Sequence, residues 1–190
     1  MRYLITAILI CCTLSLAGCG SLLATLQTEP IEDHPGDRTL GQLIEDDNIE
    51  TKAIVNIHAA NQSFHDANLV AVCYNGYLLL AGQVNSESLK SQATAVVRKI
   101  RGVRRIYNEL EIAAPSSGIT RSSDTWITTK VKSWLLGNSD IEGTGVKVVT
   151  ENGVVYLMGL VTRKEAKRVT DEAAGIAGVQ RVVQLFEWVD

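Results

Sequence analysis

The sequence predicts an α+β protein made of two tandem domains, each with the element order helix, strand, strand, helix, strand. Two observations predict this fold. The chain repeats itself when it is shifted by 77 residues, and each copy carries an Asn-Gly pair between two apolar runs. Such a pair is a strong β-hairpin signal, because a tight type I′ turn needs positive φ at both central residues. We therefore expect each copy to form a three-stranded mixed sheet with two helices.

The repeat also sets the domain boundaries. All three prolines, Pro30, Pro35 and Pro115, lie outside the two copies, and prolines between repeated segments indicate linkers. The predicted segments in chain order are a leader at 1–18, a lipidated N-terminus with a flexible linker at 19–45, the first domain at 46–113, a linker at 114–122 and the second domain at 123–190.

Each copy is expected to open with a helix, at 47–60 and at 124–137, with Asp47 and Asp124 as N-caps. These two aspartates coincide at the 77-residue shift. The same shift pairs residues of the first helix with residues of the second, in the order Ile49, Ala53 and Ile57 with Trp126, Lys130 and Trp134.

The remaining elements follow in the same order in both copies. A second helix should begin near Asn85 and near Thr162, where Thr162 and Glu165 have the spacing of a capping box. Gly102 and Gly178 are expected to cap the ends of these helices. The predicted strands are 69–74, 77–84 and 104–112 in the first copy, and 146–151, 154–161 and 180–189 in the second.

The second strand of each copy is expected to lie in the centre of its sheet. In the first copy this strand is apolar on both faces, with Leu78 and Leu80 on one face and Leu79 and Ala81 on the other. Two helices cover only one face of such a sheet, and a domain of about 70 residues is marginally stable alone. We therefore expect the two copies to pack on each other and bury the second face.

The N-terminus has the pattern of a secretory leader. Its apolar run, from Leu4 to Leu16, is shorter than the 20 or so residues that span a bilayer. The segment from Leu16 to Cys19 resembles the bacterial lipobox, whose cysteine carries the lipid anchor. Resemblance to the sorting pattern, with Gly20 rather than Asp after Cys19, implies the outer membrane. The alternative is an ordinary signal peptide that contains cysteines.

The composition gives no sign of an enzyme. The net charge of −3 provides no global attraction to polyanions, and His34, His58 and His65 lack cysteine or carboxylate partners at ligand spacing. Nucleophile and phosphate-binding motifs are missing as well. We expect no enzymatic activity, no cofactor and no metal. Cys73 is expected to be a small buried strand residue rather than a reactive thiol.

The informative feature is the helix at 124–137. With a core stripe of Ile127, Val131 and Leu135, Trp126 is turned well away from the core. A lipid-binding strip is predicted beside that stripe, formed by Trp126, Lys130, Ser133, Trp134 and Gly137. Indoles that flank a lysine suit a headgroup boundary, because an indole is apolar with one donor and an ammonium pairs with phosphate. The alternative is that both tryptophans pack between the copies, and burial is favoured for Trp134.

Basic clusters at two helix ends offer further surfaces. They comprise Arg98, Lys99, Arg101, Arg104 and Arg105 in the first copy, and Arg163, Lys164, Lys167 and Arg168 in the second. Solvated helix ends are the favoured interpretation, with anionic lipid or a nucleic-acid backbone as alternatives. No nucleic-acid partner is expected.

The lipobox, the two copies, and the segments 124–131 and 150–162 together resemble the dual BON-domain lipoproteins of the outer membrane. The resemblance implies a periplasm-facing lipoprotein that binds phosphatidylglycerol and cardiolipin through the first helix of its second domain. It also implies concentration at division sites and support of envelope integrity. Trp126 matches the family's membrane-contacting residue, whereas Trp134 departs from the usual polar residue. A rival hypothesis is a periplasmic scaffold that contacts outer-membrane protein assembly machinery through Tyr77, Tyr107 or the basic clusters.

Overall fold

The structure is a computed structural model that describes residues 38–137 and 145–190. These residues belong to one compact unit. The predicted leader at 1–18, the lipidation residue Cys19, most of the predicted linker and His34 lie outside the described residues.

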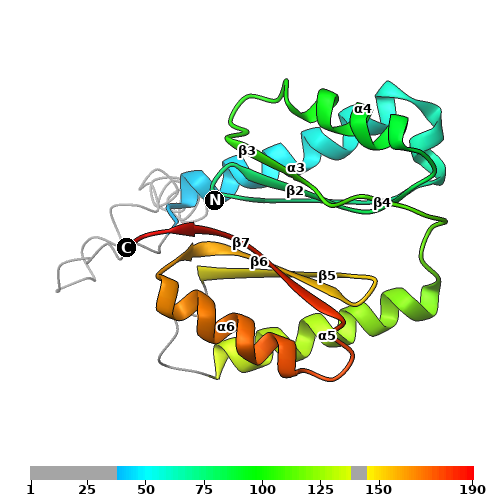
Figure 1. Cartoon of the computed structure of the whole chain (residues 1–190). Coiled ribbons are helices and arrows are strands. Elements are labelled where there is room, and N and C mark those ends of the chain that lie inside the picture. Colours follow the sequence, from blue (N-terminus) through cyan, green and yellow to red (C-terminus); the bar gives the residue numbers. More distant parts are fainter. Residues whose placement is uncertain (1–37, 138–144) are drawn as a thin grey trace, which may run out of the picture. The chain divides into compact units, whose positions relative to one another are not determined.

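Both copies have the predicted order of elements, which confirms the α+β fold class (Figure 1). The first copy consists of α3 (Leu40–Ala60), a 3-10 turn η1 (Gln62–Asp66), β1 (Asn68–Tyr74), β2 (Tyr77–Val84), α4 (Glu87–Val97), β3 (Arg105–Asn108) and β4 (Glu111–Ile112). The second copy consists of α5 (Gly118–Leu136), β5 (Val146–Glu151), β6 (Val154–Val161), α6 (Arg163–Gly175) and β7 (Arg181–Trp188).

Each sheet is mixed, with its second strand in the centre as predicted. β2 is antiparallel to β1 and parallel to β3 and β4, and β6 has the same relation to β5 and β7. Both hairpins turn at their Asn-Gly pair, where Asn75 and Asn152 have φ of 50° and 51° and the following glycines have φ of 75° and 74°. These positive values are those of a type I′ turn, so the hairpin prediction is confirmed.

The first helix of each copy begins earlier than the sequence predicted. Thr39 caps α3 in a capping box with Gln42, and Ser117 caps α5 by accepting the Thr120 N–H. The prediction of Asp47 and Asp124 as N-caps is wrong, because both lie inside their helices. The helix starts at 40 and 118 therefore fall within segments that had been assigned to linkers.

Two buried aspartates instead tie these helices to the hairpins. The Asp46 carboxylate accepts the turn N–H groups of Asn75 and Gly76, at 2.8 and 2.9 Å. Asp124 accepts the matching N–H groups in the second hairpin, at 2.9 and 2.8 Å. Asp124 is therefore the counterpart of Asp46, one residue away from the partner that the 77-residue shift gave it.

This one-residue correction changes which helix positions correspond. The buried residues of α3 are Ile49, Ala53 and Ile57, and those of α5 are Ile127, Val131 and Leu135, with the same spacing from the aspartate. The predicted pairing of the α3 stripe with the strip residues of α5 is wrong. The α3 counterparts of Trp126, Lys130 and Trp134 are Asn48, Lys52 and Asn56.

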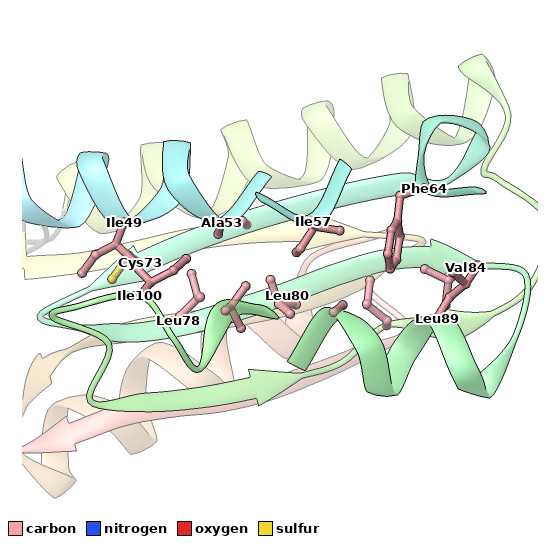
Figure 2. Close-up of a cluster of buried hydrophobic side chains, with 14 residues drawn as sticks. Ile49, Ala53, Ile57, Phe64, Cys73, Leu78, Leu80, Val84, Leu89 and Ile100 are labelled. Atoms are coloured by element: carbon pink, nitrogen blue, oxygen red, sulfur yellow. The ribbon is translucent and has the colours of Figure 1, made fainter. Parts of the chain in front are cut away.

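Three apolar clusters stabilise the fold. Figure 2 shows the first, in which side chains from α3, α4 and η1 meet one face of the first sheet. A second cluster has the same arrangement under α5 and α6. A third joins the other faces of the two sheets, with Leu79 and Ala81 from one copy and Tyr156 and Met158 from the other. The expectation that the copies bury each other's second face agrees with this cluster.

The later elements show one confirmed prediction and two differences. Thr162 and Glu165 form the predicted capping box at the start of α6. Gly102 and Gly178 are not helix caps, since they lie beyond the ends of α4 and α6. Their φ values of +93° and +100° bring them against the core, where an added Cβ would lie 3.0 and 3.1 Å from the Cδ1 atoms of Ile49 and Ile127. The third strand of the first copy is interrupted at Asn108. Its side-chain oxygen accepts the Leu110 N–H, and its side-chain amide donates to Lys90 O and Thr94 Oγ1 of α4.

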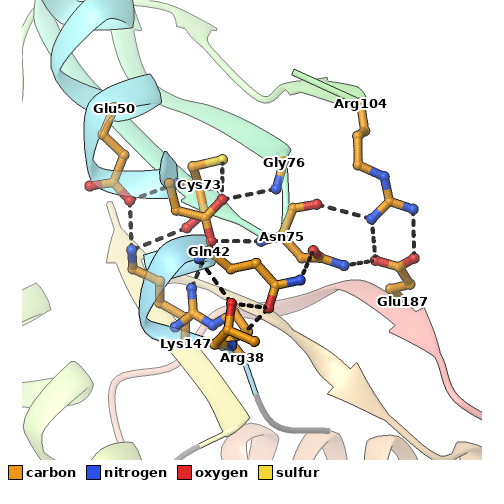
Figure 3. A network of polar contacts seen from close by, with 11 residues as sticks. Arg38, Gln42, Glu50, Cys73, Asn75, Gly76, Arg104, Lys147 and Glu187 are labelled. Carbon is orange, nitrogen blue, oxygen red and sulfur yellow. Dashed lines mark hydrogen bonds and ion pairs between the residues drawn. The ribbon is translucent and has the colours of Figure 1, made fainter. Parts of the chain in front are cut away.

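Polar contacts also connect the two copies, as Figure 3 shows. The Arg104 guanidinium donates to both carboxylate oxygens of Glu187, at 3.0 and 2.8 Å. Lys147 Nζ lies 2.6 Å from Glu50 Oε1. In a separate cluster, Glu151 Oε1 accepts the side-chain amides of Asn68 and Gln83.

Cys73 is buried in the first core, in agreement with its predicted role. Its Sγ donates to Asp46 Oδ1 at 3.1 Å. Burial and the neighbouring Asp46 carboxylate raise the pKa of the Cys73 thiol well above its usual range. Because the thiolate is the reactive form of cysteine, this environment disfavours reactivity.

Candidate lipid-contacting site

The helix α5 is held by its buried side and presents a separate side to solvent. Asp124, Ile127, Val131 and Leu135 are its buried residues. Trp126 is 62% exposed, so its indole lies outside all three apolar clusters. The alternative in which Trp126 packs between the copies disagrees with this position.

Lys130 lies one turn after Trp126 on the same side of α5. Its ammonium nitrogen is 5.7 Å from the centroid of the Trp126 ring, within the range of a cation–π contact. The ammonium also donates to the carbonyl of Ala177 at 2.8 Å, which fixes it next to the loop after α6. An ammonium has three donors, so an anion beside the indole could still be bound.

The other predicted strip residues differ in exposure. Ser133 and Gly137 are exposed, and Gly137 ends the helix by donating its N–H to Ser133 O. Trp134 is half-buried and packs against the second core. Trp126 and Trp134 therefore differ in environment, and only Trp126 presents most of its ring to solvent.

The sequence reasoning missed an exposed apolar residue on this helix. Ile119 is 85% exposed and precedes Trp126 by seven residues, which places it on the same side of α5 two turns earlier. It was missed because the helix was predicted to begin at 124. The available sequence signal was Ser117, since serine is a favoured N-cap residue, and a helix that begins after it includes Ile119.

The residues suggested for a protein contact are partly engaged within the fold. Tyr77 and Tyr107 meet edge to face, with centroids 6.1 Å apart, and pack against the cluster between the sheets. Arg104 is committed to Glu187, and Lys167 pairs with Asp171 on α6. The protein contact stays a prediction.

Within residues 38–137 and 145–190, no helix has the length and apolar character needed to cross a bilayer. The same ranges contain no group of three or more His, Cys, Asp or Glu residues that could hold a metal ion.

Comparison with known proteins identifies the family. The BON domain model matches residues 45–114 and residues 123–190, which are the two α-β-β-α-β copies. The chain belongs to the BON-domain family. It is 36% identical to the outer membrane lipoprotein DolP of Haemophilus influenzae, over 97% of this chain and 95% of that protein. This dual BON-domain chain is thus a member of the outer-membrane lipoproteins of the DolP type.

Two further relatives are less similar in sequence. The 21 kDa hemolysin of Actinobacillus pleuropneumoniae is 33% identical, over 85% of this chain and 81% of the relative. The osmotically-inducible protein Y of Escherichia coli is 29% identical, over 54% of this chain and 53% of the relative.

Proposed function

We propose that this BON-domain lipoprotein is a non-enzymatic module that binds anionic phospholipids, such as phosphatidylglycerol and cardiolipin, through α5. In this proposal Cys19 carries the lipid anchor and the folded domains face the periplasm from the outer membrane. Concentration at division sites and support of envelope integrity belong to the same proposal.

The observation that carries the proposal is the exposed indole of Trp126 beside the Lys130 ammonium. An exposed tryptophan loses apolar contact with water when it enters the headgroup boundary, and its ring N–H can still bond there. The lysine adds attraction to an anionic surface, about 1 kcal/mol for one basic residue. Both contributions arise from one side of one helix.

The anchor explains how a small patch would be sufficient. An acyl chain on Cys19 would hold the domains near the bilayer, so binding by α5 would occur at a high effective concentration. A weak headgroup contact would then be occupied most of the time. For this reason the contact should be measured without the anchor, on residues 20–190, which include every described residue.

We predict that Trp126→Glu abolishes flotation of residues 20–190 with vesicles containing phosphatidylglycerol or cardiolipin. The introduced carboxylate is repelled by the anionic surface and removes the apolar ring. Because Trp126 is exposed, the Tm should change by less than about 3 °C, since surface substitutions usually alter stability little.

Trp188→Glu is the matched control, because Trp188 is 42% exposed and lies on β7 rather than on α5. This control should float as the native chain does. Unchanged flotation of the Trp126→Glu variant would contradict the lipid site. The anchor itself is tested by the intact mass of the membrane-extracted protein, where an unmodified Cys19 would exclude the tether.

A further inference from the structure

A cleft lies between the two BON domains, on a different side of α5 from Trp126. Its volume is about 490 Å³, within the range of ligand pockets. Asn68 and Val70 of β1 form one wall, and α5 forms another. The cleft is also lined by four consecutive residues of β5, at 148–151. Because successive strand side chains point to opposite faces, a cleft that meets all four lies along the edge of the strand.

The backbone at this edge of β5 is free to pair. β5 is an end strand of its sheet, and the two-residue turn makes Glu151 and Val154 a hydrogen-bonded pair. Bonded pairs alternate, so the N–H and C=O groups of Val148 and Thr150 point away from β6. Within the described residues, none of these four groups has a hydrogen-bond partner.

At the corresponding edge of the first sheet, side chains cover the backbone groups of Cys73, the counterpart of Thr150. There the Glu50 carboxylate accepts the Cys73 N–H at 2.7 Å, and Lys147 Nζ donates to the Cys73 carbonyl at 3.2 Å. The edge of β5 has no equivalent cover among the described residues.

The α5 wall of the cleft has a cation at each end. Arg121, Thr125, Thr128 and Lys132 follow one another along this side of the helix. At 1.5 Å per residue, Arg121 and Lys132 are roughly 16 Å apart along the axis, the length of about five residues of extended chain. The two carboxylates that line the cleft, Asp124 and Glu151, lie toward the Arg121 end, where Asp124 binds the hairpin turn and Glu151 binds Asn68 and Gln83. Among the described lining residues, the Lys132 end has no carboxylate to balance its charge.

We propose that this cleft binds an extended acidic peptide segment of a partner protein, which adds as a strand to the free edge of β5. The edge alternates N–H donors with C=O acceptors, and an extended peptide supplies both complements. A phosphate group supplies only acceptors and would leave the carbonyls of Val148 and Thr150 without donors. Lys132 selects an acidic side chain near its end of the bound segment, whereas Arg121 already donates to the Ser116 carbonyl and lies beside Asp124 and Glu151.

The test is a selection of random octapeptides displayed on phage against residues 20–190. Selected peptides are expected to be rich in β-branched residues and in Asp or Glu. A synthetic copy of a selected peptide should slow amide hydrogen exchange at Val148 and Thr150. Lys132→Glu should weaken its binding at least tenfold, whereas the matched control Lys164→Glu, an exposed change on α6 outside the cleft, should leave it unchanged.

Thr150→Pro provides a second variant, because it removes an edge N–H that takes no part in pairing with β6. A near-ultraviolet circular dichroism spectrum like that of the native chain would show that the variant is folded. The folded variant should no longer bind the peptide but should still float with vesicles. Trp126→Glu should do the reverse, which separates this proposal from the lipid site. Three results would overturn the proposal. The selected peptides could lack acidic residues, the bound peptide could leave the amides of Val148 and Thr150 unprotected from exchange, or phosphatidylglycerol vesicles could protect these amides instead.

Discussion

The helices α3 and α5 have the same place in their domains but different exposed sides. Their buried positions correspond, with Ile49 matching Ile127 one turn after the aspartate that holds the hairpin. At the exposed positions α3 has Asn48 where α5 has Trp126, although both helices have a lysine four residues later. The comparison shows that packing fixes one side of each helix, while the other side is free to differ in function.

Charge increases the contrast between the two helices. Asn48 is flanked by Glu45 and Asp47, whereas the corresponding neighbours of Trp126 are Ser123 and Thr125. Carboxylates beside the exposed position oppose contact with an anionic surface. The lipid site is therefore proposed on α5 alone, even though Lys52 matches Lys130.

The largest expected effect concerns Asp46 and Asp124, the aspartates at matching positions of the two helices. Asp46 has more partners than Asp124, because it also accepts Arg38 Nη1 at 2.8 Å and the Cys73 thiol. Asp46→Ala should lower the free energy of unfolding by about 4 kcal/mol, since it leaves two turn N–H groups and the partly buried Arg38 guanidinium without their carboxylate partner. Asp124→Ala should cost about 2 kcal/mol. Urea denaturation measures both, and equal losses would contradict this difference.

The same carboxylate gives a pH dependence. Burial raises the pKa of Asp46, but hydrogen bonds from Gly76, Cys73, Asn75 and Arg38 outweigh burial and lower the pKa below its usual 3.8. A pKa lowered by folding contributes stability above the unfolded-state value, and this contribution is lost as the pH falls through the folded value. The stability that Asp46 adds should thus be constant at neutral pH and disappear below about pH 3.8. The Asp46→Ala variant should lack this loss.

A smaller effect separates the two tryptophans of α5. Trp134 packs against the second core, so Trp134→Ala should lower the free energy of unfolding by about 2 kcal/mol, less than a fully buried tryptophan would cost. At temperatures below its melting transition, the Trp134→Ala variant should float with vesicles nearly as well as the native chain. If Trp134→Ala abolished flotation and left the Tm unchanged, the roles assigned to the two rings would be reversed.

A transfer of the site to α3 tests the contrast between the two helices from the other side. In the Trp126→Glu background, Asn48→Trp alone should not restore flotation, because Glu45 and Asp47 repel an anionic surface. Adding Glu45→Ser and Asp47→Thr removes two charges worth about 1 kcal/mol each, and should raise vesicle affinity roughly 30-fold over Asn48→Trp alone. Equal affinity of the two variants would show that charge on this side of the helix is not what distinguishes α3 from α5.

Much of the fold could be predicted because its signals are local. Three signals each act over a few residues: the Asn-Gly turns, the capping box of Thr162, and the apolar side chains on both faces of β2. The structure agrees with all three. The predicted alignment of the two helices was wrong because it matched two identical residues, Asp47 and Asp124, instead of matching the spacing of the buried apolar residues. The apolar period would have given the right answer, since Ile49, Ala53 and Ile57 match only Ile127, Val131 and Leu135.

The site was less predictable than the fold. The exposure of Trp126 followed from its angle to the core stripe, but the half-buried state of Trp134 depends on how α5 rests on its sheet. Long-range contacts were beyond local patterns altogether. Nothing within a short window indicates that Arg104 meets Glu187, or that Asn68 of the first copy lines a cleft beside β5 of the second.

The most direct test of the lipid site measures how deeply Trp126 enters a bilayer. The variant Trp134→Phe with Trp188→Phe leaves Trp126 as the only tryptophan, which is excited selectively at wavelengths that tyrosine does not absorb. Brominated lipids quench an indole that reaches them. With phosphatidylglycerol vesicles we predict a blue-shifted emission and quenching by bromines near the headgroups, and neither effect with neutral vesicles. Emission that stays unshifted and unquenched on anionic vesicles would contradict the account.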